Sequence, residues 1–143
     1  MSPKLNCIML IDDDEPTNFL SSMVIQEANC TKHIQIEDSG ERALNYLLKS
    51  EEFAFNNKAY PWPDLILLDI NMPAMNGWEF LDKYKEMGNG DQSEVIIVML
   101  TTSLNQNDKI IAKGISCITD FKHKPLTRQV LNEILDKNFT AQH

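Results

Sequence analysis

The sequence predicts an α/β fold in which five parallel strands form one doubly wound sheet with helices on both faces. Short apolar runs alternate five times with segments of helical periodicity. Several runs, such as Leu-Ile-Leu-Leu at residues 65–68, are unbroken, which is typical of parallel strands buried on both faces. The length of 143 residues and the apolar fraction of 43% indicate a single domain with a full core.

The first two strand–helix units occupy residues 7–50. The first strand is predicted at residues 7–11, and a short alternating strand at residues 33–37 has the pattern of a sheet edge. Ser39 is the expected cap of the second helix. The first helix is expected to bury Phe19, Leu20, Met23 and Val24, and the second to bury Ala43, Leu44, Leu47 and Leu48.

Three further units follow. The third strand, residues 65–69, ends on Asp69, and Asn76-Gly77 opens a helix that carries Trp78, Leu81 and Tyr84. The fourth and fifth strands are predicted at residues 95–100 and 117–121, separated by a short helix with Ile110 and Ile111 that ends at Gly114. Pro125 suits the first turn of a last helix, which is expected to bury Leu126, Val130, Ile134 and Leu135. This order gives a flavodoxin-like (βα)5 sheet with strand order 2-1-3-4-5.

The connection at residues 50–63 is unusually long for such a fold. One interpretation is a surface insertion. The other is a partner-facing flap with four aromatic anchors, Phe53, Phe55, Tyr60 and Trp62.

Composition excludes several classes of function. The net charge of −8 argues against nucleic-acid or anionic-membrane binding as the main activity. No apolar run is long enough to span a bilayer, and the N-terminus lacks the pattern of a signal peptide. The three cysteines have no metal-like spacing, so Cys7 and Cys117 are interpreted as small buried hydrophobes in a reduced, cytoplasmic protein.

Polar side chains follow four of the predicted strands. Asp12 and Asp13 follow the first strand and Asp69 ends the third, so strand order 2-1-3-4-5 brings three carboxylates together. Such a cluster needs protons or a cation, and Mg²⁺ (or Mn²⁺) has the matching oxygen preference. The alternative is that residues 12–15 form only a solvated turn. A hydroxyl at Thr101 and an ammonium at Lys124 follow the fourth and fifth strands, where each is suited to hold an oxyanion.

This ordered set of side chains, with the segment DINMPAMNG at residues 69–77, resembles the receiver domain of two-component response regulators over nearly the whole chain. The resemblance implies that Asp69 is the phosphoacceptor and that Asp13, Asp69 and the backbone carbonyl of Asn71 bind the metal, with Asp12 acting through water. It further implies that Lys124, Thr101 and Thr102 bind the phosphoryl group and that Thr101 and Phe121 act as the switch. Asn71 and Ser103 are implied to tune dephosphorylation, and the Lys124–Pro125 peptide bond is implied to be cis.

Two residues depart from the family's usual pattern. The switch aromatic, often tyrosine, is Phe121, and Thr102 stands where alanine or glycine is common. Neither change affects the expected activity, which is Mg²⁺-dependent phosphoryl transfer from a kinase phosphohistidine to Asp69. The expected partners are a sensor histidine kinase or phosphotransfer protein and a downstream protein target, and a homodimer is compatible with the sequence. The expected domain organisation is one receiver domain over residues 1–143 without an output domain.

Three alternatives remain open at this stage. A haloacid dehalogenase-like phosphohydrolase would also form an aspartyl phosphate, but it carries a second acid where this chain has Asn71. A flavin-binding electron carrier would need a phosphate-binding loop where residues 12–15 are all acidic. The third alternative is a degenerate receiver that serves only as a scaffold. The expected protein is therefore a signalling phosphoacceptor that catalyses only its own phosphorylation and dephosphorylation.

Overall fold

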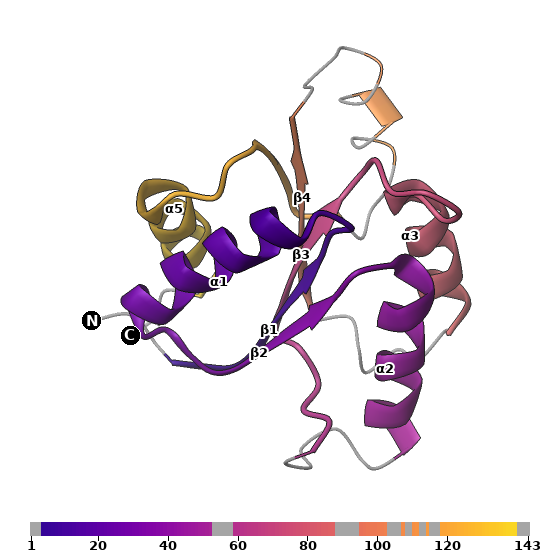
Figure 1. Cartoon of the computed structure of the whole chain (residues 1–143), viewed down its shortest axis with the longest axis horizontal. Helices are drawn as coiled ribbons and strands as arrows, with labels where there is room; N and C mark the ends of the chain where they lie inside the picture. The colour runs from indigo at the N-terminus through magenta and orange to yellow at the C-terminus, as the bar shows by residue number, and fades with distance from the viewer. Residues whose placement is uncertain are drawn as a thin grey trace.

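Five parallel strands form the single sheet of the described chain, in the predicted order β2-β1-β3-β4-β5 (Figure 1). The structure is a computed structural model that describes residues 4–52, 59–87, 95–102, 107, 110–111, 114 and 118–139. The strands are β1 (Leu5–Ile11), β2 (Thr31–Glu37), β3 (Leu65–Asp69), β4 (Ile96–Thr101) and β5 (Asp120–His123). The helices are α1 (Glu15–Ala28), α2 (Gly40–Glu52), α3 (Gly77–Glu86) and α5 (Arg128–Phe139).

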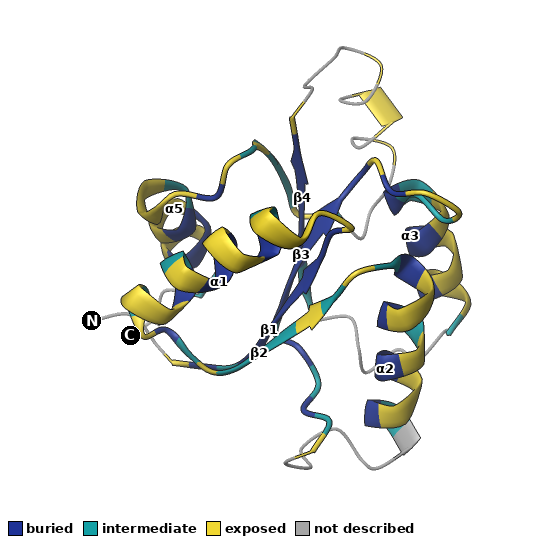
Figure 2. Cartoon of the chain, in the orientation of Figure 1, coloured by how far each residue is buried: buried dark blue, intermediate teal, exposed yellow. Residues whose placement is uncertain are grey.

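Two apolar layers enclose the sheet, one on each face. Alternate residues of β1 divide between them: Ile8 and Leu10 pack with α1 and α5, whereas Met9 and Ile11 pack with α2 and α3. All five residues of β3 are buried, so this strand lies at the centre of the molecule (Figure 2). The unbroken apolar runs of the sequence therefore mark the strands with helices on both faces, as predicted.

The buried face of α1 differs from the prediction. Phe19, Leu20 and Met23 are 62%, 58% and 41% exposed, and Figure 2 shows much of the outer side of this helix as exposed. Three polar side chains and Ile25 face the sheet instead, and they are Asn18, Ser21, Ser22 and Ile25. The buried asparagine and one of the two serines have local backbone partners: the Asn18 side-chain amide donates to the Asp12 carbonyl at 2.8 Å, and the Ser22 hydroxyl donates to the Phe19 carbonyl at 2.8 Å. Periodicity predicts the apolar stripe as the core face, because it does not report that the polar side chains of this helix can bond to nearby backbone groups.

Several element positions also need correction. The fifth strand is Asp120–His123 rather than residues 117–121, although Thr119 donates its backbone N–H to Ile97 at 2.8 Å. Pro125 lies before α5 rather than in its first turn, because α5 begins at Arg128 after a bond from the Val130 amide to the Thr127 hydroxyl. In α2, Tyr46 is buried and Leu48 is 50% exposed, whereas Ala43 and Leu47 are buried as predicted.

Parts of three predictions lie outside the described residues. They are Cys117, Phe53 with Phe55, and most of the predicted helix that ends at Gly114; Ile110 and Ile111 of that helix are helical and exposed. Tyr60 and Trp62 pack against the protein's own core instead of standing free as anchors. The hydroxyl of Tyr46 donates to the Pro61 carbonyl at 2.6 Å, which fastens the end of the long connection to α2.

The predictions about the cysteines and about membrane-spanning segments can be checked against the described residues. Cys7 and Cys30 are buried free thiols, and burial raises the pKa of Cys7 to about 12, so this side chain behaves as a small hydrophobe. None of the helices in the described ranges has the length and apolar character needed to cross a bilayer.

Candidate functional site

The acidic loop after β1 is shaped by its own hydrogen bonds. Asp14 caps α1 by accepting the Thr17 amide at 3.0 Å, so this third acid of the run is structural. The Asp12 carboxylate accepts a hydrogen bond from the backbone N–H of Asp14 at 2.9 Å. The Asp12 backbone carbonyl accepts the bond from the Asn18 side-chain amide described above. These bonds hold the Asp12 side chain at the buried side of the loop, whereas Asp13 is exposed.

A second loop joins β3 to α3 and brings the backbone close to Asp69. Asn76 and Glu79 form a reciprocal capping box at the start of α3, with both bonds at 2.9 Å. The Gly77 amide donates to the Ile70 carbonyl at 2.8 Å, which folds the helix start back onto the strand end. Ala74 has φ of 67°, a left-handed conformation that costs a non-glycine residue about 1 kcal/mol. The loop is therefore held in shape by α3.

Gly77 leaves no room for a side chain at this contact. A Cβ atom there would lie 2.7 Å from the Asp69 carbonyl oxygen and 3.0 Å from the Ile70 Cα, both backbone atoms. We expect Gly77→Ala to lower the free energy of unfolding by about 1–3 kcal/mol, because the backbone must move to relieve the clash. Urea denaturation measures this loss. Gly114→Ala is the matched control, since the nearest atom of the described residues that a Cβ there would meet is the Ile111 carbonyl oxygen at 3.5 Å.

Three carboxylates and one ammonium meet where β1, β3 and β5 end. Oxygen atoms of Asp12, Asp13 and Asp69 all lie within 4.8 Å of one another. The Lys124 Nζ lies 2.5 Å from Asp12 Oδ2 and 3.1 Å from Asp69 Oδ1. Lys124 thus neutralises one of three negative charges, and two remain at the strand ends. The structure places these four side chains together as the sequence predicted.

The surroundings shift the pKa of two of these groups. Burial, and secondly the charge of Asp12, raise the pKa of Asp69, although Lys124 and the Asn71 amide oppose this rise. Burial by itself would lower the pKa of Lys124, but its bonds to Asp12 and Asp69 outweigh that effect and raise it. The lysine is therefore a fixed positive charge, and Asp69 is a carboxylate in an environment that disfavours its negative charge.

The ends of β4 and β5 position the remaining predicted side chains. Thr101, the last residue of β4, is fully buried, and its backbone carbonyl accepts the Lys124 amide at 2.7 Å. The Lys124–Pro125 peptide bond is cis, as the resemblance implied. Thr102 and Asn71 are exposed, and Phe121 is half-buried against the core of the α2 and α3 face. Ser103 lies outside the described residues.

Two residues that shape the site were not predicted as functional. Asn18 holds the acidic loop through the Asp12 carbonyl, and Gly77 allows α3 to approach Asp69. An asparagine in the first turn of a helix is a weak signal, because its side chain commonly bonds to nearby backbone groups without any functional role. For Gly77 the sequence predicts only the start of a helix, since no sequence pattern reports how close the start of that helix lies to the end of β3.

Comparisons with known proteins agree on one family. A family model described as response regulator receiver domain matches residues 8–136. The chain is 28% identical to the two-component response regulator ARR5 of Arabidopsis thaliana, over 99% of this chain and 74% of that protein. It is 32% identical to the response regulator Rcp1 of Synechocystis, over 72% of this chain and 66% of Rcp1.

Solved structures give the same result. A two-component response regulator from Cytophaga hutchinsonii has a TM-score of 0.81 and 34% identity, covering 94% of this chain and 96% of that one. The Mn²⁺-bound form of Rcp1 has a TM-score of 0.67 and 27% identity, covering 92% and 90% of the two chains.

Proposed function

The chain belongs to the family of response regulator receiver domains, the phosphoaccepting components of two-component signalling, and on that premise we propose that Asp69 accepts the phosphoryl group. The observation that carries this proposal is the convergence of Asp12, Asp13, Asp69 and Lys124 at one edge of the sheet. Of the three acids, Asp69 is the one that lies at the centre of the sheet, next to both β1 and β4.

The donor set fits a hard divalent cation. Three carboxylates within 4.8 Å and one ammonium leave two uncompensated negative charges, which a divalent ion would balance. The Mn²⁺-bound form of Rcp1 supports the same inference by similarity. We propose that Asp13, Asp69 and the Asn71 carbonyl hold Mg²⁺ or Mn²⁺, with Asp12 bound through water. When bound, the ion would neutralise charge that develops on the transferring phosphoryl oxygens.

Phosphoryl transfer to this chain requires a nucleophile and a fixed positive charge. A carboxylate oxygen of Asp69 attacks phosphorus while the P–N bond to the donor imidazole breaks, and the product is an acyl phosphate. Lys124 is already aimed at Asp69 Oδ1 from 3.1 Å, so it can move from the carboxylate to a phosphoryl oxygen with little displacement. Removal of water by burial strengthens this interaction.

The same residues supply a response to phosphorylation. In this proposal the hydroxyls of Thr101 and Thr102 donate to the new phosphoryl oxygens, and Phe121 moves with the end of β4 to change the protein-binding surface. Thr101 ends the strand that pairs with β3, and Phe121 pairs with Met99 in the same sheet, so the two are linked through β4. Asn71 and Ser103 would then tune attack of water on the acyl phosphate.

The phosphohydrolase alternative has no support from the comparisons, which give receiver domains. Asn71 also occupies the position at which such an enzyme needs its second acid. The proposed partners are a histidine kinase or phosphotransfer protein upstream and a protein target downstream.

Direct location of the phosphoryl group tests the acceptor assignment. The protein is incubated with acetyl phosphate and Mg²⁺, reduced with borohydride, which converts an aspartyl phosphate to homoserine, and analysed by peptide mass spectrometry. Conversion at Asp69 supports the proposal, and it should vanish when EDTA replaces Mg²⁺. Modification at another aspartate, or equal modification in EDTA, contradicts it.

Trp78 should report cation binding. It is half-buried and follows Gly77, the first residue of α3, which lies against the backbone carbonyl of Asp69. We expect Mg²⁺ in the millimolar range to change Trp78 emission in a Trp62→Phe background, because the ion would draw the two acidic loops together. The added variant Asp13→Asn should shift this titration to higher Mg²⁺ concentration. An unchanged titration curve in that variant would contradict the ligand assignment.

A further inference from the structure

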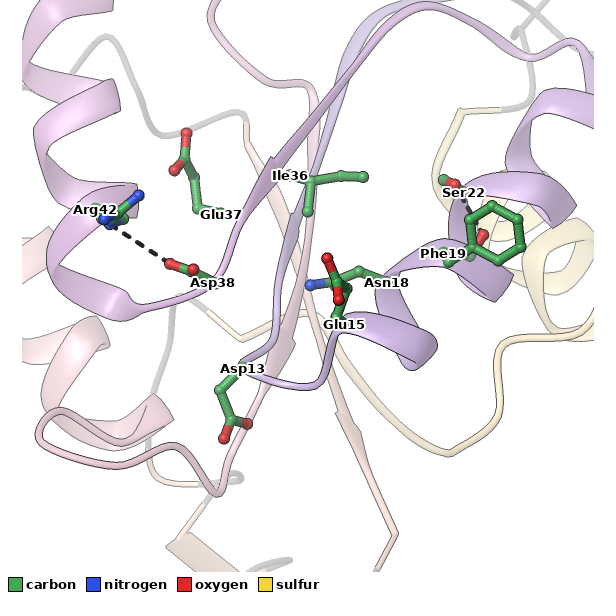
Figure 3. A pocket seen from close by; sticks show the side chains of 9 residues that line it. All are labelled: Asp13, Glu15, Asn18, Phe19, Ser22, Ile36, Glu37, Asp38 and Arg42. Atoms are coloured by element: carbon green, nitrogen blue, oxygen red, sulfur yellow. Dashed lines mark hydrogen bonds and ion pairs between the residues drawn. The ribbon is translucent and has the colours of Figure 1, made fainter.

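A hollow of about 580 Å³ lies between α1 and the C-terminal end of β2, outside the phosphoacceptor pocket (Figure 3). Its walls come from α1 with the loop before it, and from β2 with the start of α2. We name it the α1–β2 groove, and define it by six of its lining residues, Asp13, Glu15, Phe19, Ile36, Glu37 and Asp38. It lies over the edge strand of the sheet.

Two large apolar side chains in this groove are exposed. Phe19 of α1 is 62% exposed and Ile36 of β2 is 43% exposed. Ile34, two residues before Ile36 and therefore on the same face of β2, packs against the core that α1 and α5 cover. The helix layer thus covers the beginning of this strand face and leaves its end open. Exposed apolar groups gathered in a hollow are typical of a binding surface.

Carboxylates also line this hollow, on the side of the loops before α1 and α2 (Figure 3). Asp13, Glu15, Glu37 and Asp38 all line the hollow, and the cation among the lining residues is Arg42, 3.6 Å from Asp38 in an exposed pair. The Glu37 carboxylate accepts the side-chain amide of Gln35 at 2.6 Å on the other face of β2 from Ile36, so the carboxylates open to a ligand are those of Asp13, Glu15 and Asp38. An exposed pair of this kind is weak and easily exchanged for another partner. The groove therefore combines an apolar centre with an excess of negative charge.

The two uncharged polar side chains that line the groove already have hydrogen-bond partners within the protein. Asn18 is bonded to the Asp12 carbonyl, and Ser22 is bonded to the Phe19 carbonyl. What the groove offers to a partner is therefore the Phe19 and Ile36 side chains and the carboxylates that line it.

From these observations we propose that the α1–β2 groove binds a cationic segment of a partner protein. A bulky apolar side chain of that segment would lie between Phe19 and Ile36, and flanking lysines or arginines would meet Glu15 and Asp38. Asp13 lines both this groove and the carboxylate cluster, so the segment would be held beside the phosphoacceptor. A second copy of this chain is a poor occupant, because each carries a net charge of −8. The proposal concerns the unphosphorylated protein and does not depend on phosphoryl transfer.

A set of three short peptides tests this chemistry. They are Lys-Lys-Leu-Lys-Lys, the same peptide with serine for leucine, and Glu-Glu-Leu-Glu-Glu, each titrated into the ¹⁵N-labelled full chain. Saturating Mg²⁺ prevents the lysines from competing for the carboxylate cluster. We expect the lysine–leucine peptide to bind tightest and to shift amide signals of residues 15–22 and 36–42. Binding by all three alike, shifts elsewhere, or no binding of the lysine–leucine peptide would overturn the proposal.

Two variants and one control separate the apolar and charged contributions. Phe19→Ser and Asp38→Lys should each weaken binding of the lysine–leucine peptide by about tenfold, the effect of losing one important interface contact. Leu48→Ser removes a similarly exposed apolar side chain from α2, away from the groove, and should leave binding unchanged. All three sites are exposed, so the variants should fold, which circular dichroism verifies. Equal binding by Phe19→Ser and wild type would overturn the proposal.

Discussion

Asp69→Asn is expected to abolish phosphate incorporation from acetyl phosphate and, in the same protein, to increase stability at neutral pH without Mg²⁺. The first effect follows because an amide is not a nucleophile for phosphorus. The second follows because burial and Asp12 raise the pKa of Asp69, so its charge opposes folding. A neutral side chain of the same shape removes this cost, and we expect a gain of about 1 kcal/mol, the usual scale for one substitution.

The stability gain should depend on pH in a defined direction. The folded-state pKa of Asp69 lies above its ordinary value of 3.8. Its contribution to stability is therefore present below about pH 4 and lost as pH rises through the folded pKa. The advantage of Asp69→Asn should thus be largest near pH 7 and disappear toward pH 4.

Urea denaturation in EDTA at several pH values measures this difference. Asp82→Asn changes an exposed carboxylate on α3 and serves as the control. Mg²⁺ should stabilise wild type and the control but have much less effect on Asp69→Asn, which would lack one metal ligand. If Asp69→Asn is the less stable protein at neutral pH, attraction to Lys124 outweighs the burial cost and the stated sign is wrong.

The fold was predictable because the signals that define a parallel sheet are local. Apolar runs gave the strands, their order followed from connection rules, and the carboxyl-end rule brought Asp12, Asp69 and Lys124 to one edge. Residue type predicts Ser39 as the cap of the second helix, and the structure confirms it, because the Ser39 hydroxyl accepts the backbone N–H of Arg42 at 3.1 Å.

The errors arose where tertiary contacts override local pattern. On α1, three of the four residues of the predicted apolar face are exposed, whereas Val24 packs against the core as predicted. Asn18 and Ser22 can face the sheet because their polar groups are bonded internally, and Ile25 lies beside them as the fully buried apolar side chain of the helix. The fifth strand lies further along the chain than predicted because residues 117–119, Cys-Ile-Thr, have the composition of a strand, whereas the polar segment Asp120–His123 is the one that pairs with β4. The close approach of Gly77 to Asp69 is a contact between two segments, which no single segment encodes.

Lys124→Met should destabilise the protein by about 3 kcal/mol in EDTA, because it leaves Asp12 and Asp69 facing each other without their shared cation. The side chains of all three are at least 88% buried, so solvent screens the repulsion poorly. Saturating Mg²⁺ should recover much of the loss, since the ion would supply the missing positive charge. The yield of acyl phosphate should fall even in Mg²⁺, because Lys124 is the group aimed at Asp69.

A double-mutant cycle shows whether that loss arises from the lysine–carboxylate contact. Lys124→Met combined with Asp69→Asn should be clearly more stable than the sum of the two single effects implies, because each single change removes the Lys124–Asp69 attraction and the double variant loses it only once. Lys137→Met is the matched control: this lysine is 63% exposed and lies 3.6 Å from Asp120, so its removal should change stability by less than about 0.5 kcal/mol. Additive single effects, or equal losses from Lys124→Met and Lys137→Met, would show that Lys124 acts as an ordinary surface lysine. The cycle isolates the contact between Lys124 and Asp69, since Asp12 is left intact in every variant and its separate interactions with the two positions cancel in the coupling energy.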